Sequence, residues 1–119
     1  ATFGDHAFTE LAFDGPVGDF PGVLDLWGDG SVFIVYTPGH TPGSLSVVAR
    51  TTEGGMLFTG DTSHTLWGWV NGVEPGGFTV DTAQNARSLA ALKALAEAHD
   101  LTVWVGHETD GAGTGVDGR

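Results

Sequence analysis

The chain has 119 residues, of which 4 are lysine or arginine and 15 are aspartate or glutamate, so its formal net charge is −11 with neutral histidines. Such an acidic chain argues against nucleic acid or an anionic membrane as a partner, because both require a basic face. Hydrophobic residues make up 40% of the chain, which excludes an intrinsically disordered protein. Cysteine is absent, so histidine and carboxylate side chains would have to hold any metal ion.

The length favours a single domain over residues 1–119. No apolar run approaches the roughly 18 residues of a membrane span, and no signal-peptide pattern opens the sequence. We therefore expect a cytoplasmic protein without a membrane partner.

Short apolar runs predict the strands of one sheet. Residues 8–13 could form a first strand, and the run 23–27 is closed by Gly28-Asp29-Gly30, which is typical of a hairpin turn. Further β-branched and aromatic runs predict strands at 32–36, 45–49, 56–59 and 101–105. The runs 32–36, 45–49 and 101–105 are nearly continuously apolar, as in a sheet that is covered on both faces.

One helix is predicted over 82–98, where Leu89, Leu92 and Ala96 recur at helical spacing and Asp81 or Thr82 can serve as the N-cap. His99 follows at its carboxyl end, where an imidazole suits the helix dipole. The stretch 61–80 has no periodicity and predicts a long loop, a feature that is usually functional. The glycine-rich tail 111–119 is expected to be flexible.

A histidine bracketed by two Pro-Gly pairs is the most distinctive local feature, in the stretch Thr37-Pro38-Gly39-His40-Thr41-Pro42-Gly43-Ser44. Each proline favours an extended residue before it, and each glycine permits a sharp bend, so the loop should hold the His40 imidazole stiffly at a strand end. An isolated loop histidine usually has no functional role.

Two further polar residues follow strands in the same way. Asp61 comes directly after the predicted strand 56–59, and His107 comes directly after the strand 101–105. Taken singly, Asp61 would be an ordinary turn or N-cap carboxylate. Taken together, His40, Asp61 and His107 are the ligand types that a metal site at the rim of a sheet requires.

The ordered motifs TPGHTPGS, TGDT and GHE resemble the C-terminal half of the metallo-β-lactamase fold superfamily. The resemblance implies an α/β fold, namely half of an αββα sandwich in which a mixed sheet carries a flanking helix. It also implies two zinc ions in the complete site. His40 would complete the ligands of the first ion, Asp61 would bridge both ions, and His107 would bind the second.

The histidine-rich motif of the family's N-terminal half, His-x-His-x-Asp-His, is not found in this sequence. Three ligands divided between two ion positions would hold each ion poorly. The chain is therefore expected to be half of an enzyme and to be inactive alone.

Several residues of the stretch 61–80 could line a substrate pocket. His64 lies three residues after Asp61 and could contact substrate, although an ordinary loop histidine is the alternative. The aromatic side chains could wall an apolar pocket or simply cover the core; they are Trp67, Trp69 and Phe78.

The function implied by the resemblance is metal-dependent hydrolysis through metal-bound hydroxide, with Asp61 as the catalytic residue. The implied substrate is a small molecule, namely a lactone, ester, thioester or lactam. The alternative is a catalytically inactive half-domain that associates with itself. A single helix can cover only one face of the sheet, so the other apolar face should pair with a second copy or with the missing N-terminal half.

Overall fold

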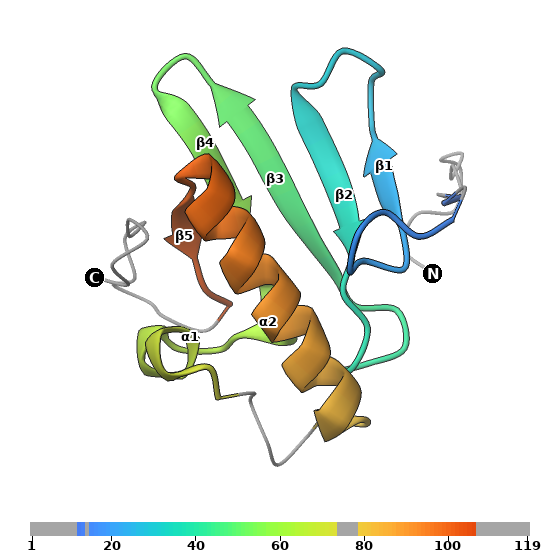
Figure 1. Ribbon diagram of the computed structural model, residues 1–119, viewed down its shortest axis with the longest axis vertical. Coiled ribbons are helices and arrows are strands. Elements are labelled where there is room, and N and C mark those ends of the chain that lie inside the picture. The colour runs from blue at the N-terminus through green and yellow to red at the C-terminus, as the bar shows by residue number, and fades with distance from the viewer. Residues whose placement is uncertain (1–11, 14, 74–78, 107–119) are drawn as a thin grey trace, which may run out of the picture.

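The computed structural model describes residues 12–13, 15–73 and 79–106, which form one mixed sheet with helices at one face and one end (Figure 1). The strands lie in chain order across the sheet: β1 (Val23–Asp25), β2 (Val32–Tyr36), β3 (Leu45–Thr51), β4 (Gly54–Phe58) and β5 (Thr102–Trp104). The first four pair antiparallel, and β5 runs parallel to β4. The predicted α/β class and mixed sheet are confirmed.

The predicted hairpin between β1 and β2 is confirmed, with Val23 opposite Val35 and Asp25 opposite Phe33. Its turn is closed by the Asp25 carboxylate, which accepts hydrogen bonds from the backbone N–H groups of Gly28 and Gly30 at 2.9–3.2 Å. A side chain at the end of the strand thus satisfies the donors of the turn that follows it.

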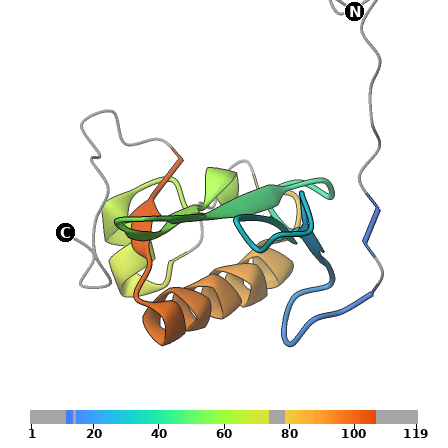
Figure 2. The ribbon, with the colours of Figure 1, turned by 90° about the horizontal axis from the view of Figure 1, so that it is seen from above.

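The long helix α2 (Thr82–His99) covers one face of the sheet, beneath the strands in Figure 2. The Asp81 side chain caps its first turn by accepting from the N–H of Gln84 at 2.9 Å, which decides between the two N-cap residues that the sequence left open, Asp81 and Thr82. Leu89, Leu92 and Ala96 are buried on this helix. With them in the core lie the helix-side residues of the strands, Val35, Val48, Leu57 and Val103.

The opposite face of the sheet is apolar as well. The register places Leu24, Ile34 and Val47 in one row across β1, β2 and β3, and the row continues with Phe58 and Trp104. Phe58 remains 39% exposed, whereas its neighbour Leu57, which faces α2, is fully buried. Among the described residues, no helix of comparable length covers this face (Figure 2). We call the row Leu24, Ile34, Val47, Phe58 and Trp104 the helix-free face.

The prediction of a structureless loop over 61–80 is wrong for the part that the structure describes. A short 3₁₀ turn, η1 (Gly60–Thr62), is followed by the helix α1 (Leu66–Asn71). The Thr65 hydroxyl caps α1 by accepting from the N–H of Gly68, and Gly72 ends the helix. Six residues are too few to establish a helical period, which is why the pattern did not show it.

Some predicted segments lie outside the described residues, namely most of the strand 8–13, the residues 74–78 and the tail 111–119. Within the described ranges, no helix combines the length and the apolar character needed to cross a membrane. The cytoplasmic location stays a prediction.

Candidate metal centre

The loop between β2 and β3 carries His40 and rests on the first turns of α2. Gly39 has φ of 141°, and a Cβ at this position would lie 2.3 Å from the Cα and N atoms of Asn85. Only a glycine allows so close an approach in this backbone conformation. The backbone N–H of His40 then donates to Oδ1 of Asn85 at 3.0 Å, and the N–H of Asp81 donates to the Gly39 carbonyl at 2.9 Å.

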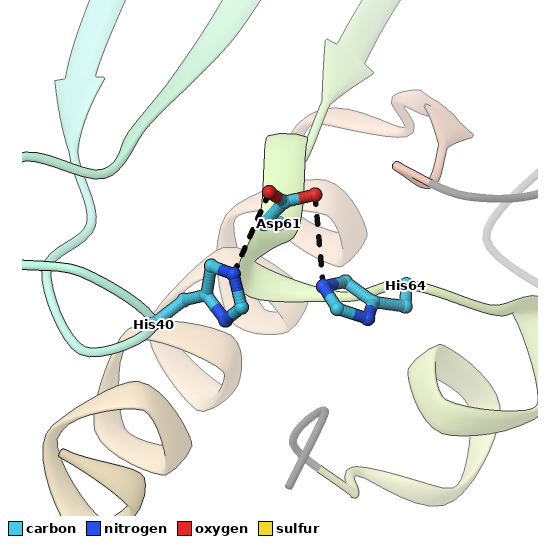
Figure 3. Close-up of side chains that lie close together, drawn as sticks. All are labelled: His40, Asp61 and His64. Atoms are coloured by element: carbon cyan, nitrogen blue, oxygen red, sulfur yellow. Dashed lines mark ion pairs between the residues drawn. The ribbon is translucent and has the colours of Figure 1, made fainter. Parts of the chain in front are cut away.

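The His40 side chain is 12% exposed and points to the carboxylate of Asp61 (Figure 3). Its Nδ1 lies 3.2 Å from the Thr79 hydroxyl, and its Nε2 lies 3.5 Å from Oδ2 of Asp61. When Nδ1 carries the proton and donates it to Thr79, Nε2 keeps its lone pair directed at the site. This is the tautomer that a metal ligand bound through Nε2 requires.

Asp61 lies in the turn η1, which follows β4, so the end of a strand paired on both sides fixes its backbone. Its side chain is 44% exposed, and its second oxygen, Oδ1, lies 3.6 Å from Nε2 of His64. One ligand atom from each of His40, Asp61 and His64 lies within 4.8 Å of the other two. The chain thus brings two predicted metal ligands and one predicted pocket residue into a single cluster.

His107 lies outside the described residues. Gly106, the residue before it, packs against the same turn, since a Cβ on Gly106 would lie 2.5 Å from the Gly60 carbonyl oxygen and 3.0 Å from Oδ1 of Asp61. The N–H of Gly106 also donates to the Ser63 carbonyl at 2.9 Å. The chain therefore leaves β5 at the rim that holds His40 and Asp61.

A buried polar network beneath the cluster was missed by the sequence analysis. Asn85 is fully buried, and its amide joins the two ligand-bearing segments, because Oδ1 accepts from His40 and Nδ2 donates to the Thr62 carbonyl at 3.1 Å. Hydroxyl bonds link Thr62 to Thr37 at 3.1 Å and Thr37 to Ser46 at 2.9 Å. The signal was available: Asn85 precedes Leu89 by one helical turn, on the apolar side of the helix.

The aromatic residues proposed for a pocket do not share one environment. Trp69 is 3% exposed and belongs to the hydrophobic core, whereas Trp67 is 66% exposed on α1. Phe78 lies outside the described residues. A cavity of about 840 Å³ lies elsewhere, between the sheet and the carboxyl-terminal part of α2, and its lining residues include Phe20, Phe33 and Leu95. None of His40, Asp61 and His64 borders it.

The donor set of the cluster suits a divalent ion such as zinc, which proteins bind through histidine nitrogens and carboxylate oxygens. Two imidazoles and one carboxylate are also the composition of known three-ligand catalytic zinc sites. The residues therefore fit the metal ion that the resemblance implies.

A family model described as the metallo-beta-lactamase superfamily matches residues 2–107 of the chain. The chain belongs to this superfamily. The match contains the motifs TPGHTPGS and TGDT and ends at His107, the histidine of the motif GHE.

Curated relatives within the superfamily include lactone-cleaving and lactam-cleaving proteins. The N-acyl homoserine lactonase AttM of Rhizobium radiobacter is 39% identical over 87 residues, which are 72% of this chain and 33% of that protein. A gamma-lactamase of Fusarium pseudograminearum is 41% identical over 58 residues, 46% of this chain and 13% of that protein. The chain thus spans about a third of the length of its lactonase relative.

A solved structure of an N-acyl homoserine lactone hydrolase, with N-hexanoyl-L-homoserine bound at its catalytic metal center, superposes with a TM-score of 0.66 and 28% identity. The match covers 75% of this chain and 34% of that one. The expected fold, half of a metallo-β-lactamase sandwich, is confirmed by this match together with the mixed sheet.

Proposed function

We propose that the chain supplies one half of the active site of a metal-dependent hydrolase that opens a lactone ring. The observation that carries the proposal is the cluster of His40, Asp61 and His64, whose ligand atoms lie within 4.8 Å of one another at the rim of the sheet. Identity of 39% to an N-acyl homoserine lactonase supports the substrate class. The site residues proposed for the metal are His40, Asp61 and His107, with zinc as the ion and two ions in the complete site.

The residues of this chain have separate tasks in the proposed reaction. The Thr79 hydroxyl and the Asn85 amide hold the ring and the backbone of His40, so that Nε2 stays directed at the Asp61 carboxylate. Asp61 places a negative charge with two acceptor oxygens at the centre of the site. A bound divalent ion supplies Lewis acidity there, by lowering the pKa of a water molecule and polarising the ester carbonyl.

The proposed substrate is a five-membered cyclic ester with an acyl side chain. An N-acyl homoserine lactone is such an ester, and a gamma-lactam is the corresponding cyclic amide, so both relatives attack a carbonyl within a small ring. The net charge of −11 also disfavours a polyanionic substrate such as RNA.

A chimera tests this function. The chain would be joined behind the part of the Rhizobium radiobacter lactonase that precedes the matched segment, loaded with zinc, and assayed with N-acyl homoserine lactones and gamma-lactams. We expect lactone opening that Asp61→Asn abolishes and that His99→Ala, an exposed histidine at the far end of α2, leaves unchanged. A folded, zinc-loaded chimera that opens neither ring would contradict the proposal.

The second candidate is an inactive half-domain that pairs with a copy of itself. The helix-free face favours it, because Phe58 and Leu45, which share a side of the sheet, are 39% and 37% exposed. The same apolar surface could instead receive the N-terminal half of the fold, so oligomeric state and activity together separate the two candidates.

A further inference from the structure

The position of His64 distinguishes it from an ordinary loop histidine. Its neighbours in the chain are both fixed: the Ser63 carbonyl accepts from the Thr59 hydroxyl at 3.1 Å and from the N–H of Gly106 at 2.9 Å. Thr65 caps α1 through its hydroxyl. The His64 backbone is therefore held on both sides, so the position from which its ring reaches the cluster is fixed.

The ring of His64 converges on the carboxylate that His40 also approaches. Nε2 of His64 is buried and lies 3.6 Å from Oδ1 of Asp61, while Nε2 of His40 lies 3.5 Å from Oδ2 (Figure 3). The two rings meet edge to face, with centroids 5.0 Å apart and planes at 75°. Both imidazoles thus present the same nitrogen to one carboxylate from two sides.

These separations are too long for hydrogen bonds and suit ligands that share an ion. A charge-assisted bond from an imidazolium to a carboxylate spans about 2.7–2.9 Å. Two ligands of one tetrahedral zinc ion with bonds of about 2.0–2.1 Å lie about 3.4 Å apart. The observed 3.5 and 3.6 Å are close to the second spacing, but they reach different oxygens of Asp61. With one atom from each residue, the three ligands lie within 4.8 Å of one another, so a single ion would draw the side chains slightly closer together.

We infer that His64 is a metal ligand, and that His40, Asp61 and His64 together form a site in which this chain alone binds one zinc ion. The inference deepens the proposed function, on which it depends for the identity of the ion, but it assigns His64 to metal binding instead of substrate contact. It also revises the expectation that this half of the fold would hold an ion poorly, because three ligands converge without the rest of the site. Three protein ligands are the number that catalytic zinc sites use.

The test measures zinc binding by the 119-residue chain and needs no catalytic activity. The metal-free chain is titrated with zinc in a calorimeter, and long-range ¹H–¹⁵N spectra follow the histidine ring nitrogens. We expect one zinc per chain and a shift of the His64 Nε2 resonance to that of a metal-bound nitrogen. His64→Ala and the similar-sized His64→Gln should each raise the Kd at least about 100-fold, whereas the control His99→Ala should leave it unchanged.

The failures of the two proposals are distinguishable. If both His64 variants bind zinc like the parent chain while His40→Ala loses it, His64 is not a ligand and the proposed function stands. If His40→Ala and Asp61→Asn bind zinc like the parent chain, the metal centre itself is wrong, and the role of His64 with it. Should a His64 variant fail to fold, the parent spectrum decides, since a His64 Nε2 resonance that zinc leaves in place overturns the inference.

Discussion

At the scale of single residues, the two ligand-bearing segments meet through one buried amide. Asn85 accepts a hydrogen bond from the His40 backbone and donates one to Thr62, the residue after Asp61. The separation of two segments 21 residues apart in the sequence, around His40 and Asp61, is thus set by the length of one side chain on α2. A hydrogen-bonded amide with no exposed surface is stabilising only while both partners are present.

Asn85→Ala should lower the free energy of unfolding by about 2–3 kcal/mol, because it leaves the His40 N–H and the Thr62 carbonyl without their partner inside the protein. The control is Asn71→Ala, an exposed asparagine whose Nδ2 donates to the Trp67 carbonyl of its own helix, with an expected loss below about 0.5 kcal/mol. Urea denaturation followed by tryptophan fluorescence measures both. Equal losses in the two variants would contradict the bridging role.

The two glycines of the histidine loop offer a matched comparison. Gly39→Ala should destabilise the chain by at least about 3 kcal/mol, since the new Cβ would lie 2.3 Å from the Asn85 backbone at a φ of 141°. Gly43→Ala should change stability by less than about 0.5 kcal/mol, because no heavy atom lies within 4 Å of a Cβ there. Thermal unfolding of both variants checks the difference, and a tolerated Gly39→Ala would mean that the loop does not rest on α2.

At the scale of elements, the turn between β1 and β2 contains the Asp29 carboxylate, whose titration shows whether the turn is formed. The Ser31 hydroxyl donates to Asp29 at 2.6 Å and the Ser31 N–H donates at 3.0 Å. These two bonds hold the pKa of Asp29 below its ordinary value, and the bond from the Ser31 hydroxyl contributes more than the bond from the N–H. A carboxyl with a lowered pKa in the folded state stabilises above its unfolded pKa, and this contribution is lost as the pH falls through the lowered value.

Ser31→Ala should therefore raise the pKa of Asp29 towards that of an unperturbed aspartate and weaken the acid-pH dependence of hairpin stability. Carbon-13 NMR of the side-chain carboxyl during a pH titration measures the shift. Ser44→Ala, which removes a hydroxyl from the loop between β2 and β3, is the control and should leave the Asp29 titration in place. An Asp29 pKa that Ser31→Ala does not move would show that this turn is not formed in solution.

At the scale of the whole molecule, the sheet has one face buried by α2 and one apolar face without such a cover in the described part of the chain. The stacked pair Phe58 and Trp104, with ring centroids 6.3 Å apart, lies on that face at the carboxyl ends of β4 and β5. Each Å² of apolar surface removed from water stabilises the associated state by about 25 cal/mol, so a face of this kind favours association.

The isolated chain should form a dimer at micromolar concentration, and Phe58→Asp should shift it to monomer by placing a charge on the helix-free face. Ala90→Asp, on the exposed side of α2, is the control and should leave the dimer intact. Sedimentation velocity measures both. A parent chain that is monodisperse and monomeric would contradict self-association and favour a surface made for the other half of the fold.

The isolated chain should also fail to hydrolyse lactones when supplied with zinc, because it contains no His-x-His-x-Asp-His segment to complete a two-ion site. A chromatographic assay of ring opening, with an intact N-acyl homoserine lactonase as the positive control, measures this. Turnover that disappears in His40→Ala would overturn the expectation and would imply that a second copy supplies the missing ligands.

The sequence by itself determined the strands, the long helix and the two ligand-bearing loops. Local chemistry was sufficient there: β-branched runs favour strands, the Asp81 side chain caps the helix, and Gly39 permits a backbone that other residues avoid. The family followed from the same motifs, because the order of TPGHTPGS, TGDT and GHE along the chain can be recognised without knowing any distance between them.

Only the tertiary structure decided what those loops meet. His64 is close to Asp61 in the sequence, but both meet His40 only because β4 and η1 place them at the rim of the sheet beside the histidine loop. Asn85 becomes a bridge because α2 packs its first turns beneath the histidine loop. The physical reason is the same in both cases: ligand geometry and buried hydrogen bonds depend on distances between elements, which packing sets and which no local pattern encodes.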